Sequence, residues 1–222
     1  MNIAIIAAMD KEMRLMLPLL RATKNITING YVFHTGTIGQ HSVVLSKCGI
    51  GKVNAAICAL TLIDTFHPDL LINSGVAGGT GSAGILDVVV ADSVAYHDVW
   101  CGDGTVPGQA DGCPQRFECG LAADIRKKIP GTKGGLVASG DSFVTEAATI
   151  QRILDIYPDA VAVDMESAAI AHVCHLKNVP FVCIRVISDT PGSADNISQY
   201  ENFWDEAPAH TFAAIESLLA AI

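Results

Sequence analysis

Short apolar segments of strand length alternate with longer segments of helical periodicity along the whole chain. A continuous apolar run is typical of a buried strand, and apolar residues spaced three and four apart are typical of a helix. We therefore predict strands at residues 2–8, 69–73, 87–95, 135–139, 160–163 and 181–187. Helices are predicted at residues 10–20, 52–66, 146–156, 165–176 and 198–222, the last broken near Pro208.

This alternation predicts an α/β fold, with a single domain over residues 1–222 and a largely parallel sheet covered by helices on both faces. A hairpin with strands at residues 31–35 and 42–46 makes the predicted sheet mixed. Two irregular segments, residues 99–120 and 192–198, are expected to be loops. Ligands of such sheets bind beyond the carboxyl ends of the strands, so the functional residues are expected there.

Composition narrows the class of protein. Half of the 222 residues are hydrophobic and 17% are charged, with a mean hydropathy of +0.38, so the chain can bury a large core. The formal net charge of -9 argues against a duplex nucleic-acid binder, which needs a basic face. Charged residues interrupt every apolar segment well before about 18 residues, so we expect no membrane span. The N-terminal segment lacks the basic region of a secretory signal, which favours a cytoplasmic protein.

Cysteine usage agrees with a reducing compartment. Seven scattered cysteines form an odd count, which is typical of reduced thiols used as small hydrophobes rather than of a disulfide framework. The spacing of His97, Cys101, Cys113 and Cys119 matches no compact zinc pattern. We therefore expect neither a metal nor another cofactor.

Charged residues lie where the predicted strands end. Glu12, Glu166 and Asp189 each come soon after a strand, and Arg185 lies within the last strand. The helix dipole explains a carboxylate such as Glu12 in a first turn, and Asp189 alone fits a turn or cap residue equally well. Glu166 enters an apolar helix, which is costly without partners, and Arg185 needs an ion-pair partner among these carboxylates. We expect the four side chains to converge on one cleft.

Two further features follow predicted strands. The glycine-rich run at residues 74–79 lacks the Lys-Ser/Thr ending of a Walker loop and the full dinucleotide fingerprint. Either a close approach of backbone to ligand or a tight turn explains it. Phe143 comes after the strand at residues 135–139, where its ring can stack on a flat ligand.

Five ordered motifs in these regions resemble those of the 5′-methylthioadenosine/S-adenosylhomocysteine nucleosidases, within the nucleoside phosphorylase superfamily. They are IIAAMDKE (5–12), GIGKVNAA (49–56), SGDSF (139–143), VDMESAAIA (163–171) and RVISD (185–189). The resemblance runs from Met1 to about Asp189 and more loosely to the end. It implies a three-layer nucleoside-phosphorylase-like fold, a homodimer, and hydrolysis of the N-glycosidic bond of 5′-thio-substituted adenosines to adenine and the thioribose.

The resemblance also implies a role for each candidate residue. Glu12 resembles the base that activates water, Asp189 the acid at purine N7, and Glu166 the carboxylate that holds the ribose hydroxyls. The other implied substrate contacts are Met165 at the ribose; Phe143 and the Val144 backbone at the purine; Met9, Ile50 and Tyr200 at the 5′ group; Arg185 and Ser188 as orienting residues; and Val76, Ala77 and Gly78.

This chemistry needs acids with different protonation states. Adenine departs more easily when N7 is protonated, and the sugar then develops oxocarbenium character, as in glycoside hydrolysis. Asp189 must therefore hold a proton near neutral pH, and burial and neighbouring carboxylates are expected to raise its pKa. The helix N-termini are expected to keep Glu12 and Glu166 ionised.

Some positions depart from the family pattern and leave the natural 5′ substituent open, a futalosine-like group included. Val76 replaces a small or hydroxyl residue, Asp164 replaces the usual Glu, and residues 99–104 replace the usual run. A phosphorylase is one alternative, but only Lys11, Arg14, Lys52 and Arg185 lie near the strand ends to bind phosphate. A non-enzymatic nucleoside-binding protein is the other, and retention of the three carboxylates disfavours it.

Overall fold

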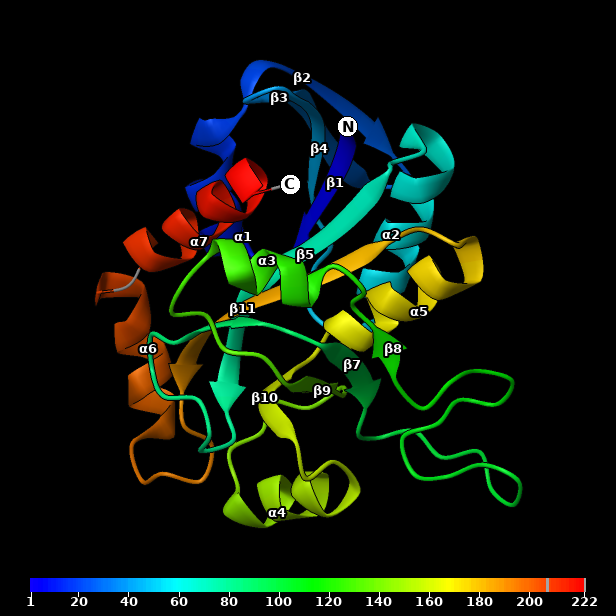
Figure 1. The fold of residues 1–222 in the computed structure, drawn as a ribbon, viewed down its shortest axis with the longest axis vertical. Helices are drawn as coiled ribbons and strands as arrows, with labels where there is room; N and C mark the ends of the chain where they lie inside the picture. The colour runs from blue at the N-terminus through cyan, green and yellow to red at the C-terminus, as the bar shows by residue number, and fades with distance from the viewer. Residues whose placement is uncertain (207, 222) are drawn as a thin grey trace.

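A mixed sheet of 11 strands runs through the centre of the computed structural model, which describes residues 1–206 and 208–221. The strands are β1 (Asn2–Ala7), β2 (Arg21–Ile28), β3 (Tyr31–Ile38), β4 (His41–Lys47), β5 (Leu70–Gly79), β6 (Val88–Val90), β7 (Ser93–Tyr96), β8 (Phe117–Glu118), β9 (Leu136–Ser139), β10 (Ala160–Asp164) and β11 (Phe181–Asp189). Their order is β2-β3-β4-β1-β5-β10-β9-β7-β8, and β11 pairs with both β5 and β6 (Figure 1).

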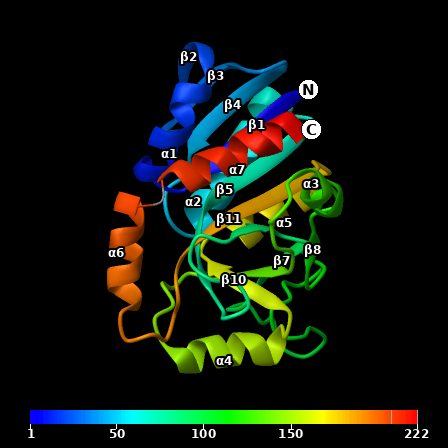
Figure 2. The same cartoon turned by 60° about the vertical axis from the view of Figure 1, so that its left-hand side comes forward.

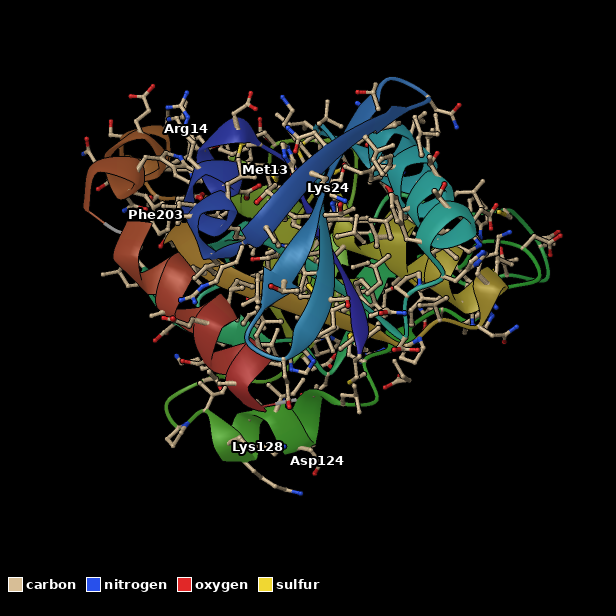
Figure 3. The ribbon with its side chains drawn as sticks, turned by 90° about the horizontal axis from the view of Figure 1, so that it is seen from above. Met13, Arg14, Lys24, Asp124, Lys128 and Phe203 are labelled. Atoms are coloured by element: carbon tan, nitrogen blue, oxygen red, sulfur yellow. The ribbon has the colours of Figure 1, made fainter. Side chains whose placement is uncertain are left out.

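Helices cover both faces of this sheet. They are α1 (Asp10–Met16), α2 (Lys52–Phe66), α3 (Ala122–Lys128), α4 (Ala147–Ile156), α5 (Ser167–Lys177), α6 (Asn196–Glu206) and α7 (Pro208–Ala221). Helices α1, α3 and α7 lie together on one face, and α2 packs against α5 on the other (Figure 2). Figure 3 shows the same division from above, with α3, marked by Asp124 and Lys128, on the side away from α2. The predicted α/β class, with a mixed sheet between helical layers, is confirmed.

The parallel pairs at the centre bring the functional strand ends together. Strand β1 lies parallel to β4 and β5, and β5 lies parallel to β11. Almost every residue of β1, β5 and β11 is buried, as continuous apolar runs predict. The carboxyl ends of β1, β5 and β11 therefore open at one edge of the core.

Strand β5 is longer than predicted and includes the glycine-rich run. It pairs with β1 from Leu70 onward and with β10 at its end, where Gly78 pairs with Val163 and Gly79 pairs with Ala162. The predicted strand at residues 69–73 is therefore too short, and a tight turn does not explain the glycine-rich run. The glycines allow close packing, because a Cβ on Gly79 would lie 2.5 Å from the carbonyl oxygen of Ala83.

Other boundaries differ from the predictions for local reasons. Strand β2 was not predicted, because its polar and largely exposed residues lack an apolar alternation, and α3 was also missed. The predicted helix at 10–20 ends as α1 at Met16, and a 3-10 turn containing Pro18 completes it. The segment predicted as a loop at 99–120 contains the short β8.

The predicted strand at residues 87–95 is two strands with different neighbours. Strand β6 pairs with β11, whereas β7 pairs with β8 and β9. Between them, the Asp92 carboxylate accepts hydrogen bonds from Arg126 and the Gly135 backbone. The final predicted helix begins earlier, at Asn196, and α7 begins at Pro208. Residue 222 lies outside the described residues.

Candidate active site

One pocket opens where the central strands end. It is lined from the segment after β1, from the second half of β5, from the ends of β10 and β11, and from α6, and its empty volume with the open mouth is about 620 Å³. Every predicted site residue except Arg185 lines it: Met9, Glu12, Ile50, Val76, Ala77, Gly78, Phe143, Val144, Met165, Glu166, Ser188, Asp189 and Tyr200. The pocket therefore brings together segments that are far apart in the sequence.

Glu12 is held almost entirely by backbone groups. Its side chain is 2% exposed, and its Oε2 accepts hydrogen bonds from the backbone N–H groups of Ala8 and Met9, both at 2.9 Å. Its Oε1 accepts from the N–H of Val76 at 3.1 Å. A Cβ at Gly75 would lie 2.6 Å from Oε1, so only glycine leaves room for this carboxylate.

Burial dominates the protonation of Glu12. Removal from water raises the pKa of its carboxyl, while the positive charge of Arg185 and the three backbone donors act in the opposite direction. The expectation that the N-terminus of α1 lowers this pKa is therefore wrong, because burial outweighs the groups that favour the ionised form.

Glu166 lies at the residue before α5 and faces the same pocket. Its Oε1 accepts a hydrogen bond from the Gly51 backbone N–H at 2.9 Å, which ties the start of α5 to the start of α2. Burial, followed by the negative charge of Asp164, raises the pKa of Glu166 to about 7. Here too the structure contradicts the expected lowering of the pKa by a helix N-terminus.

Asp189 ends β11 and is 2% exposed. Its Oδ1 accepts a hydrogen bond from the Ser188 hydroxyl at 2.6 Å, and its Oδ2 accepts from the side-chain amide of Asn196. Burial raises the pKa of Asp189, whereas these two donors lower it. The direction of the shift and burial as its cause agree with the prediction, whereas the neighbouring carboxylates that were also expected to raise this pKa are not among its causes.

Apolar and aromatic side chains form the rest of the wall. The rings of Phe143 and Tyr200 meet edge to face with centroids 5.4 Å apart. The Tyr200 hydroxyl donates to the Met9 sulfur at 3.3 Å. Phe143 is 49% exposed and Ile50 is 55% exposed, so both have surface free to contact a ligand. The pocket thus combines carboxyl groups with flat and flexible apolar surfaces.

Arg185 lies behind the pocket rather than in its wall. It was expected to pair with Glu12, Glu166 or Asp189, but its guanidinium pairs with Asp164 at 2.6 Å. The same guanidinium donates to the backbone oxygen of Asn73 at 3.1 Å and also to the side-chain oxygen of Asn73. Arg185 therefore joins β11 to β10 and β5 beneath the site.

Sequence reasoning missed two residues at this centre. Asp164 ends β10, and its carboxylate accepts hydrogen bonds from Arg185, Ser139 and Ser167. A buried arginine in a strand requires a counter-ion, and the ends of neighbouring strands were the place to search for it. Asn196 lay at the edge of a predicted polar loop, where no local pattern marks a partner of Asp189.

No cysteine or histidine lines this pocket among the side chains that the structure describes. All seven cysteines are free, and five of them are buried. Among the described side chains, no group of three or more His, Cys, Asp or Glu is arranged to hold a metal ion. Within residues 1–206 and 208–221, no helix has the length and apolar character needed to cross a membrane.

Comparison with known proteins gives matches over nearly the whole chain. The sequence profile described as "Phosphorylase superfamily" matches residues 2–220. The chain is 40% identical over 230 residues to a 5′-methylthioadenosine/S-adenosylhomocysteine nucleosidase from Anoxybacillus flavithermus, covering 99% of this chain and 98% of the relative.

Solved structures agree with this sequence match. The Streptococcus pneumoniae nucleosidase of the same name, in complex with the transition-state inhibitor MT-ImmA, superposes with a TM-score of 0.94 at 37% identity, covering 100% of this chain and 99% of the other. The Colwellia psychrerythraea nucleosidase in complex with adenine superposes with a TM-score of 0.93 at 33% identity, covering 100% and 95%.

The buried ion pair predicts a large stability difference between two substitutions. Arg185→Met leaves Asp164 buried without its counter-ion, and we expect it to lower the free energy of unfolding by about 3–5 kcal/mol. Lys177→Met removes the exposed Lys177–Asp64 pair and should cost at most about 1 kcal/mol. Denaturant unfolding of both variants measures the difference, and equal losses would contradict this account of Arg185.

Proposed function

We propose that this chain, which belongs to the 5′-methylthioadenosine/S-adenosylhomocysteine nucleosidase family of the phosphorylase superfamily, hydrolyses the N-glycosidic bond of 5′-thio-substituted adenosines. The products are adenine and the corresponding thioribose. The observation that carries this proposal is the gathering of Glu12, Glu166 and Asp189 around one pocket whose other wall is aromatic and apolar.

Asp189 supplies the proton that adenine needs in order to leave. As the bond between the anomeric carbon and N9 breaks, electrons flow into the purine, and N7 takes the proton from the Asp189 carboxyl. Burial favours the protonated form of Asp189 before this step. The two side-chain donors on Asp189 then stabilise the carboxylate that remains.

Glu166 and Glu12 act on the sugar and on the water. Glu166 accepts hydrogen bonds from the ribose hydroxyls, and its negative charge stabilises the oxocarbenium-like transition state, supported by Met165. Glu12 takes a proton from the attacking water, so that the oxygen forms its bond to the anomeric carbon as N9 departs. The three backbone donors and the charge of Arg185 support the ionised form that Glu12 needs.

The remaining walls bind the two ends of the nucleoside. Phe143 stacks on the purine, and the Val144 backbone pairs with its Watson–Crick edge. Met9, Ile50 and Tyr200 contact the 5′-thioalkyl group, where the thioether of Met9 offers a polarizable surface. The other assigned substrate contacts are Val76, Ala77, Gly78 and Ser188, which line the same pocket, with Arg185 orienting the site from behind.

Hydrolysis accounts for the site better than phosphorolysis. Within the described part of the chain, no Lys, Arg or His lines the pocket. Lys52 is paired with Asp98 at 2.8 Å, and Arg185 is paired with Asp164. A phosphate in this pocket would meet carboxyl groups without a compensating cluster of cations.

A second copy of this chain fits the exposed face of α2. Val53, Ile57 and Leu60 are 69%, 46% and 41% exposed at helical spacing, and Ile50, which lines the pocket, is 55% exposed just before the helix. Such a contiguous apolar stripe is typical of a protein interface. We place the homodimer contact there, and the cytoplasm as the compartment, because reducing conditions keep free thiols such as these seven unpaired.

Release of free base tests the reaction. The purified chain should liberate adenine from 5′-methylthioadenosine and from S-adenosylhomocysteine at equal rates with and without inorganic phosphate, because water is the nucleophile. Chromatography of the products measures adenine, and a panel of 5′-modified adenosines and inosines gives the preferred 5′ group. Strict dependence on phosphate would indicate a phosphorylase, and tight nucleoside binding without turnover would indicate a binding protein.

Two isosteric substitutions test the assigned acids. Glu12→Gln and Asp189→Asn each remove one proton transfer and should lower kcat by about 10²–10⁴-fold, while the thermal unfolding transition shows that the variants still fold. Asp10→Asn is the matched control, because Asp10 lies on the same helix with its side chain 72% exposed. Near-wild-type kcat in either isosteric variant would exclude the role given to that residue.

The dimer contact predicts a change in molecular mass. Val53→Asp introduces a charge into the apolar stripe and should convert a dimer, of twice 23.3 kDa, into a monomer. Ile26→Asp changes an exposed residue of β2, 43% accessible, and should leave the dimer intact. Size-exclusion chromatography with light scattering measures both, and a monomeric wild-type chain would refute the contact.

A further inference from the structure

Asn196 contacts the acid of the pocket although it does not line the pocket itself. It is the first residue of α6, it is 3% exposed, and its side-chain Nδ2 donates to Asp189 Oδ2. Ser188 donates to the other carboxyl oxygen, so the described hydrogen bonds to this carboxyl come from one neighbour in sequence and one residue seven positions away.

The side chain of Asn196 is not used as a helix cap. A capping asparagine accepts a backbone N–H through Oδ1, but the Oδ1 of Asn196 is buried and has no hydrogen-bond partner within the described structure. A buried, unpaired amide oxygen is costly and requires an explanation. The carboxyl of Asp189, which gains and loses a proton in the proposed reaction, lies directly beside it.

We propose that Asn196 is a positioning residue for Asp189. While Asp189 holds its proton, the unpaired Oδ1 of Asn196 accepts a hydrogen bond from it, and after Asp189 has given the proton to N7, the amide N–H of Asn196 donates to the carboxylate. This inference rests on the proposed nucleosidase reaction. With Asp189 ionised, the observed Nδ2–H···Oδ2 bond stabilises the negative charge left behind at N7 protonation. With Asp189 protonated and no purine bound, rotation about the Cβ–Cγ bond of Asn196, a soft two-fold torsion, presents Oδ1 to an Oδ2 hydroxyl. When the purine binds, N7 replaces Oδ1 as the acceptor of that proton, and the amide turns back to donate its N–H to the carboxylate that remains.

The donor also affects how readily the acid gives up its proton. Burial favours the protonated carboxyl, and a proton held too firmly is transferred poorly to N7. The N–H of Asn196 favours the carboxylate, so it strengthens Asp189 as an acid while burial keeps it protonated at the start. With an apolar residue at position 196, only the hydrogen bond from Ser188 would oppose the effect of burial, which raises the pKa of Asp189.

Other ionisable groups near Asp189 are common to all variants of Asn196. Those lining the same pocket are Glu12 from α1, Asp164 from β10, Glu166 before α5 and Tyr200 from α6; Arg185 lies earlier on β11, and Asp195 and Glu201 flank or belong to α6. These groups are present in every variant, so a change of the pH profile in Asn196→Leu reports on the loss of the amide, and a change in Asn196→Asp reports on the exchange of the amide for a carboxyl.

The pH dependence of turnover tests the inference. Activity should fall at alkaline pH as Asp189 loses its proton, and Asn196→Leu removes the donor that favours this loss. The alkaline limb of kcat should therefore move upward by about one to two pH units. At neutral pH, kcat of Asn196→Leu should fall about tenfold while KM changes less than threefold. Because its alkaline limb lies at higher pH, the ratio of its kcat to that of the wild type should increase as the pH rises.

Two further variants separate this role from a structural one. Asn196→Asp keeps the shape and places a second carboxyl beside Asp189, so the pair shares a proton and the limb should also move upward. Gln199→Leu removes the hydrogen bond that the Thr190 backbone N–H donates to Gln199 Oε1, without touching Asp189, and should leave the alkaline limb of the kcat profile where it is in the wild type. Should Asn196→Leu fail to fold, the isosteric Asn196→Asp still provides the measurement.

The outcomes distinguish failure of the proposed reaction from failure of the proposed role of Asn196. A wild-type chain that releases no adenine overturns the nucleosidase reaction itself. An active wild type with profiles at residue 196 that coincide with wild type, or with an equal shift in Gln199→Leu, overturns the role of Asn196 and leaves the reaction intact.

Discussion

The ion pair between Arg185 and Asp164 is the constraint on which the site depends. A guanidinium 2% exposed at the centre of a sheet must be neutralised, and Asp164 at the end of β10 does this at 2.6 Å. The same guanidinium donates a hydrogen bond to Asn73 and so connects β5 to β10 and β11. Three strands that carry pocket residues are thereby fixed to one another below the pocket floor.

Strand β5 then places the carboxylates around that floor. Because it pairs with β1 in its first half, with β10 at its end and with β11 along most of its length, its backbone passes along the whole base of the site. Gly75 leaves the space that Glu12 occupies, and Gly78 lies against Pro191, where a Cβ would approach to 2.6 Å. The glycines therefore serve to pack side chains against backbone rather than to turn the chain.

The sequence was informative about strand ends and less so about what lies between them. Apolar runs predicted β1, β9, β10 and β11 closely, and the rule on strand ends identified the residues of one pocket. The pairing of Arg185 with Asp164 was not predictable in the same way, because it depends on β10 lying antiparallel to β5. The polar β2 carries no apolar alternation, and the depth at which Glu12 and Glu166 are buried appears only in three dimensions.

The burial of Glu12, Glu166 and Asp189 determines how their protonation states must be explained. Burial raises the pKa of all three carboxyls, so helix dipoles do not decide which one is ionised. Hydrogen-bond donors and neighbouring charges oppose or add to the effect of burial differently at each carboxyl. Glu12 has three backbone N–H donors and Glu166 has one. Arg185 lowers the pKa of both carboxyls, and the negative charge of Asp164 raises the pKa of Glu166. The three donors and the charge of Arg185 support the ionised form of Glu12 against the burial that raises its pKa, and this is the form that activation of water requires.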